Sequence, residues 1–150
     1  MRIKKFILVL CLAIVLLSTV NGCKAQKNGL VDGYYTAEMS SFSHGWKEFV
    51  SIRISDGKIV TVEYNAKNPS GFIKSWDIQY MRNMNGVAGT YPNRYTRAYA
   101  ASLLEAQSVE GIDAVSGATS SGGNFRQMVA LLLDKAKAGD TAVGIVELQE

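Results

Sequence analysis

The segment 113–121 contains one carboxylate and four hydroxyl side chains next to small residues, an arrangement that could bind or be joined to a ligand. It reads Asp-Ala-Val-Ser-Gly-Ala-Thr-Ser-Ser and ends where a helix is expected to begin, near Ser121 or Gly122. Small residues precede the hydroxyl of Thr119, so a bulky partner can approach it. The free N–H groups and positive dipole end of a helix start suit a phosphate. A loop that ends in a serine N-cap has the same pattern, and the residue types alone favour this simpler interpretation.

Other kinds of catalytic site lack the residues they need. The chain has one histidine, His44, and two cysteines, of which Cys11 lies in an N-terminal apolar run. This excludes a Cys/His nucleophilic site and disfavours a zinc or iron centre. Neither a Gly-x-Gly-x-x-Gly nor a phosphate-loop lysine motif occurs. The pattern Ser-His-Gly-Trp at 43–46 favours an exposed loop position for His44 over a metal site.

The charge balance excludes nucleic acid as a partner. The first 22 residues contain three of the 16 basic residues and none of the 13 acidic ones, so the rest of the chain is neutral. Its basic residues are scattered among acidic ones, whereas a nucleic-acid binder needs a basic stripe. The hydrophobic fraction of 47% and charged fraction of 19% are those of a globular chain, which excludes a disordered protein.

The N-terminal residues predict export and a lipid anchor. An unbroken apolar run from Phe6 to Leu17 follows a basic start, which is typical of a secretory signal peptide over 1–22. Even extended to Val20, the run is shorter than the roughly 20 residues of a bilayer span, which disfavours an uncleaved transmembrane anchor. Residues 20–23, Val-Asn-Gly-Cys, resemble a bacterial lipobox, so Cys23 is expected to become the lipid-bearing N-terminus. The alternative is plain secretion with a free thiol at Cys23.

The remaining chain divides into a polar, flexible tether over 23–29 and one domain over 30–150. Alternating or β-prone residues predict strands over 34–40, 49–54 and 59–64. Asp56-Gly57 predicts a tight turn between the last two. In the third strand the side chains of Val60, Val62 and Tyr64 are expected on the buried face. The first half of the domain is therefore predicted to be an antiparallel sheet.

Helical periodicity replaces the strand pattern in the second half. A short helix is predicted over 75–84, a second helix after Pro92, and a third that ends at Gly139 as its C-cap. Strands followed by helices indicate an α+β fold, with helices packed on the antiparallel sheet. Residues 143–148 fit an edge strand and a loose tail equally well. The apolar stripe of the third helix comprises Phe125, Met128, Val129, Leu132, Leu133 and Ala136.

The pattern Asp-x-x-Ser-Gly-Ala-Thr at 113–119, followed by a helix, resembles the flavinylation motif of the FMN-binding domain family. The resemblance implies that Thr119 carries FMN through a phosphoester bond, attached by a flavin transferase that takes FMN from FAD. It also implies that the transferase reads Asp113 and Ser116, and that Gly117 and Ala118 leave steric room.

The chain departs from the commonest family form directly after this motif. Ser120, Ser121 and two glycines follow the threonine, and the glycines are expected to weaken the first helical turn. Ser120 and Ser121 are also the next candidates for attachment should Thr119 not be the site.

The resemblance extends over most of the domain. Residues 32–35, 45–49, 56–58, 75–84 and 89–92 are similar to small exported lipoproteins of this family. These include spirochaetal major membrane immunogen lipoproteins and Gram-positive lipoproteins that carry electrons out of the cell. For the flavin ring, the expected contacts are stacking by Trp46 or Tyr80 and a hydrogen bond to Asp77. The simpler alternative is that the two aromatic residues only cover the sheet.

The resemblance implies an electron-transfer protein without substrate turnover of its own, because FMN accepts one or two electrons. Its expected partners are membrane lipid through Cys23, the flavin transferase, a quinol-linked membrane donor and an unidentified acceptor. It would lie on the outer side of the cytoplasmic membrane, extracellular or periplasmic. Two alternatives stay open: a surface lipoprotein with an antigenic, adhesive or structural role and no flavin, and noncovalent FMN in the same pocket.

Overall fold

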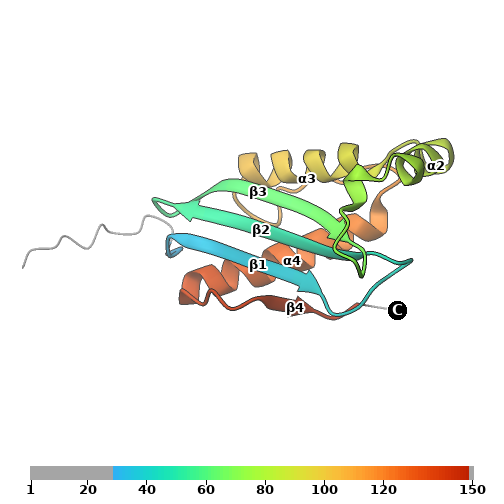
Figure 1. The fold of residues 1–150 in the computed structure, drawn as a ribbon. Coiled ribbons are helices and arrows are strands. Elements are labelled where there is room, and N and C mark those ends of the chain that lie inside the picture. Colours follow the sequence, from blue (N-terminus) through green and yellow to red (C-terminus); the bar gives the residue numbers. More distant parts are fainter. Residues whose placement is uncertain (1–28, 149–150) are drawn as a thin grey trace, which may run out of the picture.

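Four strands form one open sheet in the computed structural model, which describes residues 29–148 (Figure 1). The strands are β1 (Gly33–Met39), β2 (Lys47–Ser55), β3 (Lys58–Lys67) and β4 (Gly144–Val146), in the order β3-β2-β1-β4. The first three pair antiparallel, as predicted, and β4 pairs parallel with β1. The predicted signal peptide, Cys23 and all of the tether except its last residue lie outside the described residues.

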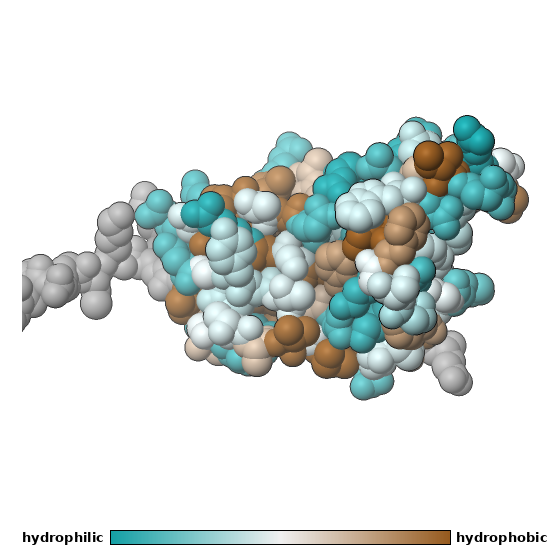
Figure 2. Space-filling view, in the orientation of Figure 1, coloured by the Kyte–Doolittle hydropathy of each residue, from teal (hydrophilic) through white to brown (hydrophobic). Residues whose placement is uncertain are grey.

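Within residues 29–148, three α-helices accompany the sheet and confirm the α+β class. They are α2 (Ile78–Ala88), α3 (Pro92–Ala106) and α4 (Thr119–Ala138), and a 3-10 turn η1 (Lys74–Trp76) precedes α2. Helices α3 and α4 lie against one face of the sheet, where α3 packs on β3 and α4 on β1 and β2 (Figure 1). Figure 2 shows the opposite face of the sheet mostly in white and teal, so a single hydrophobic core lies between sheet and helices.

The hairpin of β2 and β3 has one departure from the predicted alternation. Val60 is 45% exposed, although the alternation placed it on the buried face. Arg53 pairs with Thr61 while its neighbour Ile54 pairs with Ile59, so Val60 is the extra residue of a β-bulge. Because the bulge shifts the register by one residue, Ile59 takes the inward position and is 3% exposed.

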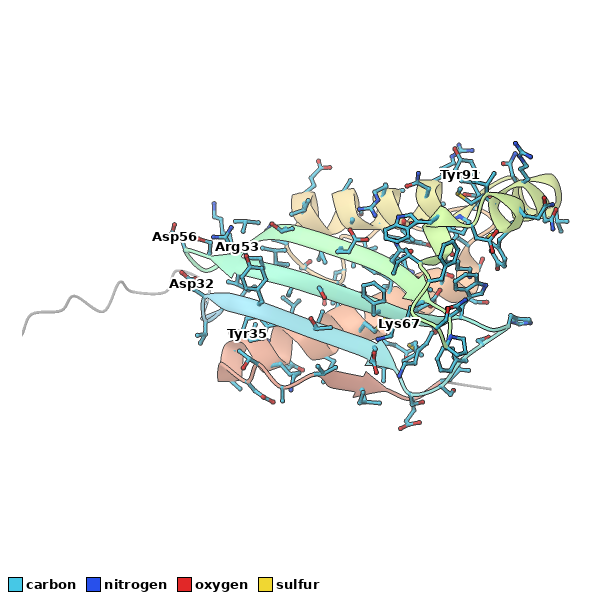
Figure 3. All side chains as sticks on the ribbon, in the orientation of Figure 1. Asp32, Tyr35, Arg53, Asp56, Lys67 and Tyr91 are labelled. Carbon is cyan, nitrogen blue, oxygen red and sulfur yellow. The ribbon has the colours of Figure 1, made fainter. Side chains whose placement is uncertain are left out.

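Asp32 fixes the end of the sheet where β1 begins. Its two carboxylate oxygens accept hydrogen bonds from the backbone N–H groups of Asp56 and Gly57, each at 3.1 Å. The segments 32–35 and 56–58, which are far apart in the sequence, are therefore joined by hydrogen bonds at this end of the sheet. Figure 3 places Asp32 and Asp56 at this end of the sheet and Lys67 toward the other end.

The predicted helix over 75–84 is wrong at its start, because the segment divides at Asp77. Residues before it form η1, and the carboxylate of Asp77 accepts a hydrogen bond from the backbone N–H of Tyr80 at 2.9 Å, which caps α2. The undecided C-terminal residues include an edge strand, β4, whose backbone pairs with the end of β1.

Helix α4 begins earlier than predicted, at Thr119 rather than near Ser121 or Gly122. The backbone N–H of Gly122 donates to the carbonyl of Ala118 at 2.9 Å and closes the first turn. A β-carbon at Gly122 would lie 2.2 Å from the hydroxyl oxygen of Tyr99. The glycine thus leaves room for the Tyr99 side chain of α3 beside the first turn of α4, and this contact outweighs its low helix propensity. At the other end Gly139 is the left-handed C-cap, as predicted.

Gly122→Ala is expected to destabilise the protein by about 1–3 kcal/mol through overpacking. Tyr99 cannot easily retreat, because it is 1% exposed and its hydroxyl donates to Ala118 and accepts from the N–H of Val115. Gly123→Ala is the matched control: apart from its chain neighbours and the backbone of its own helix, no atom lies within 4 Å of the added β-carbon. That variant should gain up to about 1 kcal/mol from helix propensity. Chemical denaturation measures both, and equal stabilities would contradict the packing role of Gly122.

Candidate functional site

A pocket of about 440 Å³ lies at the end of the sheet where β1 ends and β2 begins. This end pocket is lined by Met39, Trp46, Glu48, Lys74, Tyr80 and residues 117–121, among others. Its volume falls in the range of small-molecule sites. The fold thereby joins three distant segments: the loop before β2, the region of η1 and α2, and the first turn of α4. Six residues predicted for cofactor binding meet here: Trp46, Tyr80, Gly117, Ala118, Thr119 and Ser120.

The other three predicted cofactor contacts do not line the end pocket. Asp77 caps α2: its carboxylate accepts a hydrogen bond from the backbone N–H of Tyr80. This structural role explains the presence of Asp77 without a ligand. Asp113 and Ser116 are exposed in the loop that precedes α4. Their predicted role, to be read by a transferase, stays a prediction.

Thr119 is the first residue of α4 and is exposed. The N-cap residue, Ala118, has no side chain that caps the helix. The first N–H groups of an α-helix have no carbonyl partner within the helix, so this end of α4 presents donors beside the Thr119 hydroxyl. The arrangement can bind an anionic group such as a phosphate.

Gly117 and Ala118 have a packing role that the sequence did not reveal. The φ of Gly117 is +77°, and a β-carbon there would lie 2.2 Å from the carbonyl oxygen of Ala88 at the end of α2. Ala118 is 4% exposed and belongs to the core. Gly117 is therefore required for the loop to pack against α2, and Ala118 contributes to the core, in both cases independently of any ligand.

Aromatic rings form a further part of the wall of the end pocket. The Trp46 and Tyr80 rings meet edge to face, with centroids 5.7 Å apart. Trp46 is 8% exposed, and its loop is held by reciprocal backbone hydrogen bonds to Ser43 of 2.8 and 2.9 Å. His44 is exposed on this loop, as predicted, and also lines the pocket.

Glu48 is a site residue that sequence reasoning missed. It is 8% exposed and accepts hydrogen bonds from the Ser121 hydroxyl at 2.6 Å and the Asn124 amide at 2.7 Å. The carboxylate thus ties the start of β2 to the first turn of α4. Burial raises the pKa of the nearby Tyr64 hydroxyl, and the charge of Glu48 raises it further. The available signal was a charged residue that continues the inward alternation of Val50, Ile52 and Ile54.

Lys74 was also missed, and it stands in the aromatic wall. Its ammonium nitrogen lies 4.7 Å from the centroid of the Tyr80 ring and 5.9 Å from that of Trp46. Both distances are those of cation–π contacts. The residue as a whole is only 8% exposed.

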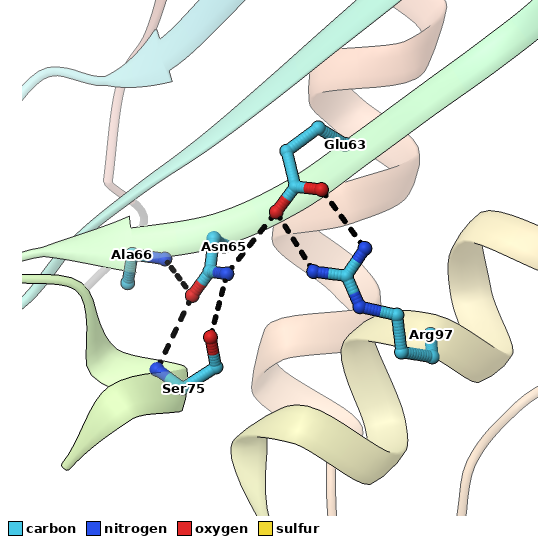
Figure 4. Close-up of polar contacts among 5 residues, drawn as sticks. All are labelled: Glu63, Asn65, Ala66, Ser75 and Arg97. Carbon is cyan, nitrogen blue, oxygen red and sulfur yellow. Dashed lines mark hydrogen bonds and ion pairs between the residues drawn. The ribbon is translucent and has the colours of Figure 1, made fainter.

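A polar network holds the η1 turn against the sheet (Figure 4). The Asn65 side chain donates to Ser75 at 2.9 Å and to Glu63 at 3.1 Å, and Arg97 of α3 forms an ion pair with Glu63 at 2.8 Å. Burial alone would raise the pKa of the Glu63 carboxyl, but hydrogen bonds from Arg97 and Asn65 outweigh it and lower that pKa. The network fixes the backbone at Ser75, directly after Lys74.

Two further features of residues 29–148 bear on the kind of site. Within that range no three His, Cys, Asp or Glu side chains gather as ligands for a metal ion. No helix in the same range combines the length and the hydrophobicity needed to cross a bilayer.

Residues 29–148 form a small α+β domain that has one sheet, and the end pocket is large enough for a small-molecule ligand. The chain is 35% identical over 132 residues to the 15 kDa lipoprotein of Treponema pallidum (strain Nichols), a match that covers 87% of this chain and 89% of the relative. The chain belongs to the family of that lipoprotein. No known family profile matches the sequence, so kinship with FMN-binding domains stays a prediction from the motif.

Two solved structures from clostridia are similar in sequence and fold. The crystal structure of a Clostridium perfringens protein matches with 38% identity and a TM-score of 0.76, over 80% of this chain and 99% of that one. A solution structure from Clostridium thermocellum matches with 30% identity and a TM-score of 0.50, over 70% of this chain and 91% of that one.

Proposed function

We propose that this protein is an exported, lipid-anchored electron carrier that holds FMN in the end pocket through a phosphoester bond to Thr119. The observation that carries the proposal is the meeting of the uncapped start of α4 with the aromatic wall of Trp46 and Tyr80 in one pocket. The sequence motif predicted the first of these and the resemblance predicted the two aromatic contacts, and the tertiary fold brings both into one pocket.

The residues of the end pocket fit FMN at both of its ends. The phosphate needs donors and an accessible hydroxyl, which the first turn of α4 and Thr119 offer. The flat ring needs apolar and aromatic surface, which Trp46, Tyr80 and Met39 offer. When bound, FMN supplies the electron chemistry, and the protein supplies position and electrostatics.

Attachment requires FAD and a transferase. The Thr119 oxygen forms a bond to the phosphorus of the FMN half of FAD, and the pyrophosphate P–O bond breaks. AMP leaves, and the hydroxyl proton of Thr119 is released in the reaction. The exposed side chain of Thr119 allows an external enzyme to reach it.

The anchor is proposed to be Cys23, outside the described residues. Its lipobox-like context and the membership of a lipoprotein in the family support this assignment. A covalent cofactor suits such a location, because a noncovalent one would be lost by dilution outside the cell. A quinol-linked membrane dehydrogenase is the proposed donor.

The decisive experiment is expression with and without a flavin transferase, followed by denaturation and desalting. We expect a yellow protein only with the transferase, and the mass of FMN less one water on the peptide that contains Thr119. Colour that is lost on denaturation would instead indicate noncovalent FMN. A colourless protein in both hosts would support a surface lipoprotein without flavin.

A further inference from the structure

We infer that Lys74 is the residue that receives the acceptor edge of a ring in the end pocket and favours the reduced over the oxidised cofactor. This inference rests on the proposed function and adds to it a second contact for the cofactor, besides Thr119, within the end pocket. It assigns a positioning and tuning role, and no catalytic role, to Lys74.

The environment of Lys74 is unusual for a lysine. Lys74 is only 8% exposed. Even so, no carboxylate among residues 29–148 lies within ion-pair distance of its ammonium group. The more buried of the other lysines do have such partners: Lys47 pairs with Glu38, and Lys135 with Asp140. A lysine is rarely buried unless it is paired, because removal of a charge from water is costly.

The position of the ammonium group is fixed from two sides. Contacts with the Tyr80 and Trp46 rings hold it within the pocket wall. The hydrogen bonds between Ser75 and Asn65 hold the adjacent backbone on β3 (Figure 4). Lys74 therefore presents a donor at a defined place rather than sweeping through solvent.

No other charged residue that lines the pocket forms an ion pair with Lys74. Glu48 is the carboxylate that lines the pocket, and its oxygens accept from Ser121 and Asn124. His44, the other basic group that lines the pocket, is exposed on the loop that carries Trp46. The pocket consequently has one unmatched positive group, next to aromatic surface, which suits a flat ring that carries carbonyl oxygens at one edge.

The pyrimidine edge of the FMN ring has this chemistry, since it carries carbonyl and ring-nitrogen acceptors. Two-electron reduction adds negative charge to that edge, so a fixed cation beside it stabilises the reduced form more than the oxidised form. With the phosphate at Thr119 and the ring edge at Lys74, these two contacts would set the direction in which FMN lies.

The test compares Lys74→Met and Lys74→Gln with Lys74→Arg in full-length protein flavinylated by the transferase. Loss of the charge should lower the preference for the reduced cofactor about tenfold, which is about 30 mV in the midpoint potential of a two-electron couple. Lys74→Arg should keep the potential near that of the wild type. Lys58→Met, at an exposed position beside the β2–β3 turn, is the control for net charge.

The outcomes separate the two proposals. A yellow wild type whose potential and absorption spectrum are unchanged in both neutral variants overturns the role of Lys74 but leaves the flavin function standing. An equal shift of the midpoint potential in Lys58→Met would also overturn the role of Lys74, because the effect would then come from the net charge of the protein. A wild type that takes up no flavin overturns both proposals.

Discussion

Thr119→Ala is expected to abolish denaturation-resistant flavin while the domain keeps its fold. The substitution removes the only atom of residue 119 that can form the phosphoester. Thr119 is exposed at the first position of α4, so its side chain contributes well under 1 kcal/mol to stability. Covalent flavin is measured by absorbance after denaturation and by peptide mass, and the fold by circular dichroism and thermal unfolding.

Two serine variants complete this experiment. Ser120→Ala should retain full flavinylation, and Thr119→Ser should retain part of it, because the hydroxyl is kept. If covalent flavin persists in Thr119→Ala, attachment lies elsewhere. Ser120 is then the first candidate, because it is exposed, whereas the Ser121 hydroxyl is already donated to the buried carboxylate of Glu48.

Cys23→Ser should move the protein from the membrane fraction to the soluble fraction. Loss of the thiol removes every acyl chain, and two chains are enough for stable anchoring. The expected shift is therefore nearly complete, and it is measured by fractionation after a high-salt wash. Cys11→Ser is the matched control, since Cys11 lies in the middle of the predicted signal peptide and should leave the protein on the membrane.

Membrane association that is unchanged in Cys23→Ser would argue against a lipid at Cys23 as the anchor. It would indicate instead that the apolar run at 6–17 stays attached as an uncleaved anchor. The N-terminal residue of the purified protein distinguishes the two cases directly.

Local patterns predicted the elements of this fold well. The alternation of Val50, Ile52 and Ile54 and the stripe that begins at Phe125 depend only on neighbouring residues, and both lie in the core. The bulge at Val60 was missed because it depends on the pairing of β3 with β2, which a single strand does not encode. The start of α4 was misplaced because Gly122 looked like a weak helix residue. Its small size is instead required by the Tyr99 side chain of α3, and a contact between two helices cannot be read from one segment of sequence.

The candidate site was predictable only in part, for a similar reason. The motif at 113–119 is contiguous and identified one side of the end pocket. Glu48 and Lys74 are single charged residues in different segments, and their importance lies in burial that only the tertiary fold creates. The proximity of Trp46 to Tyr80 likewise arises from packing between a loop and α2.

The opposite placement of Asp32 and the end pocket on the sheet determines the reach of this molecule. The chain enters β1 at the Asp32 end, and the seven residues of β1 separate that end from the pocket by about 20 Å. Residues 24–29 add at most about 20 Å more between Cys23 and the domain. With the lipid at Cys23, an upright domain would hold its cofactor tens of ångströms above the bilayer, and a domain lying flat would bring it close. On the proposed function, the length of the sheet therefore sets how far an FMN bound in the end pocket would lie from the point where the chain enters the domain.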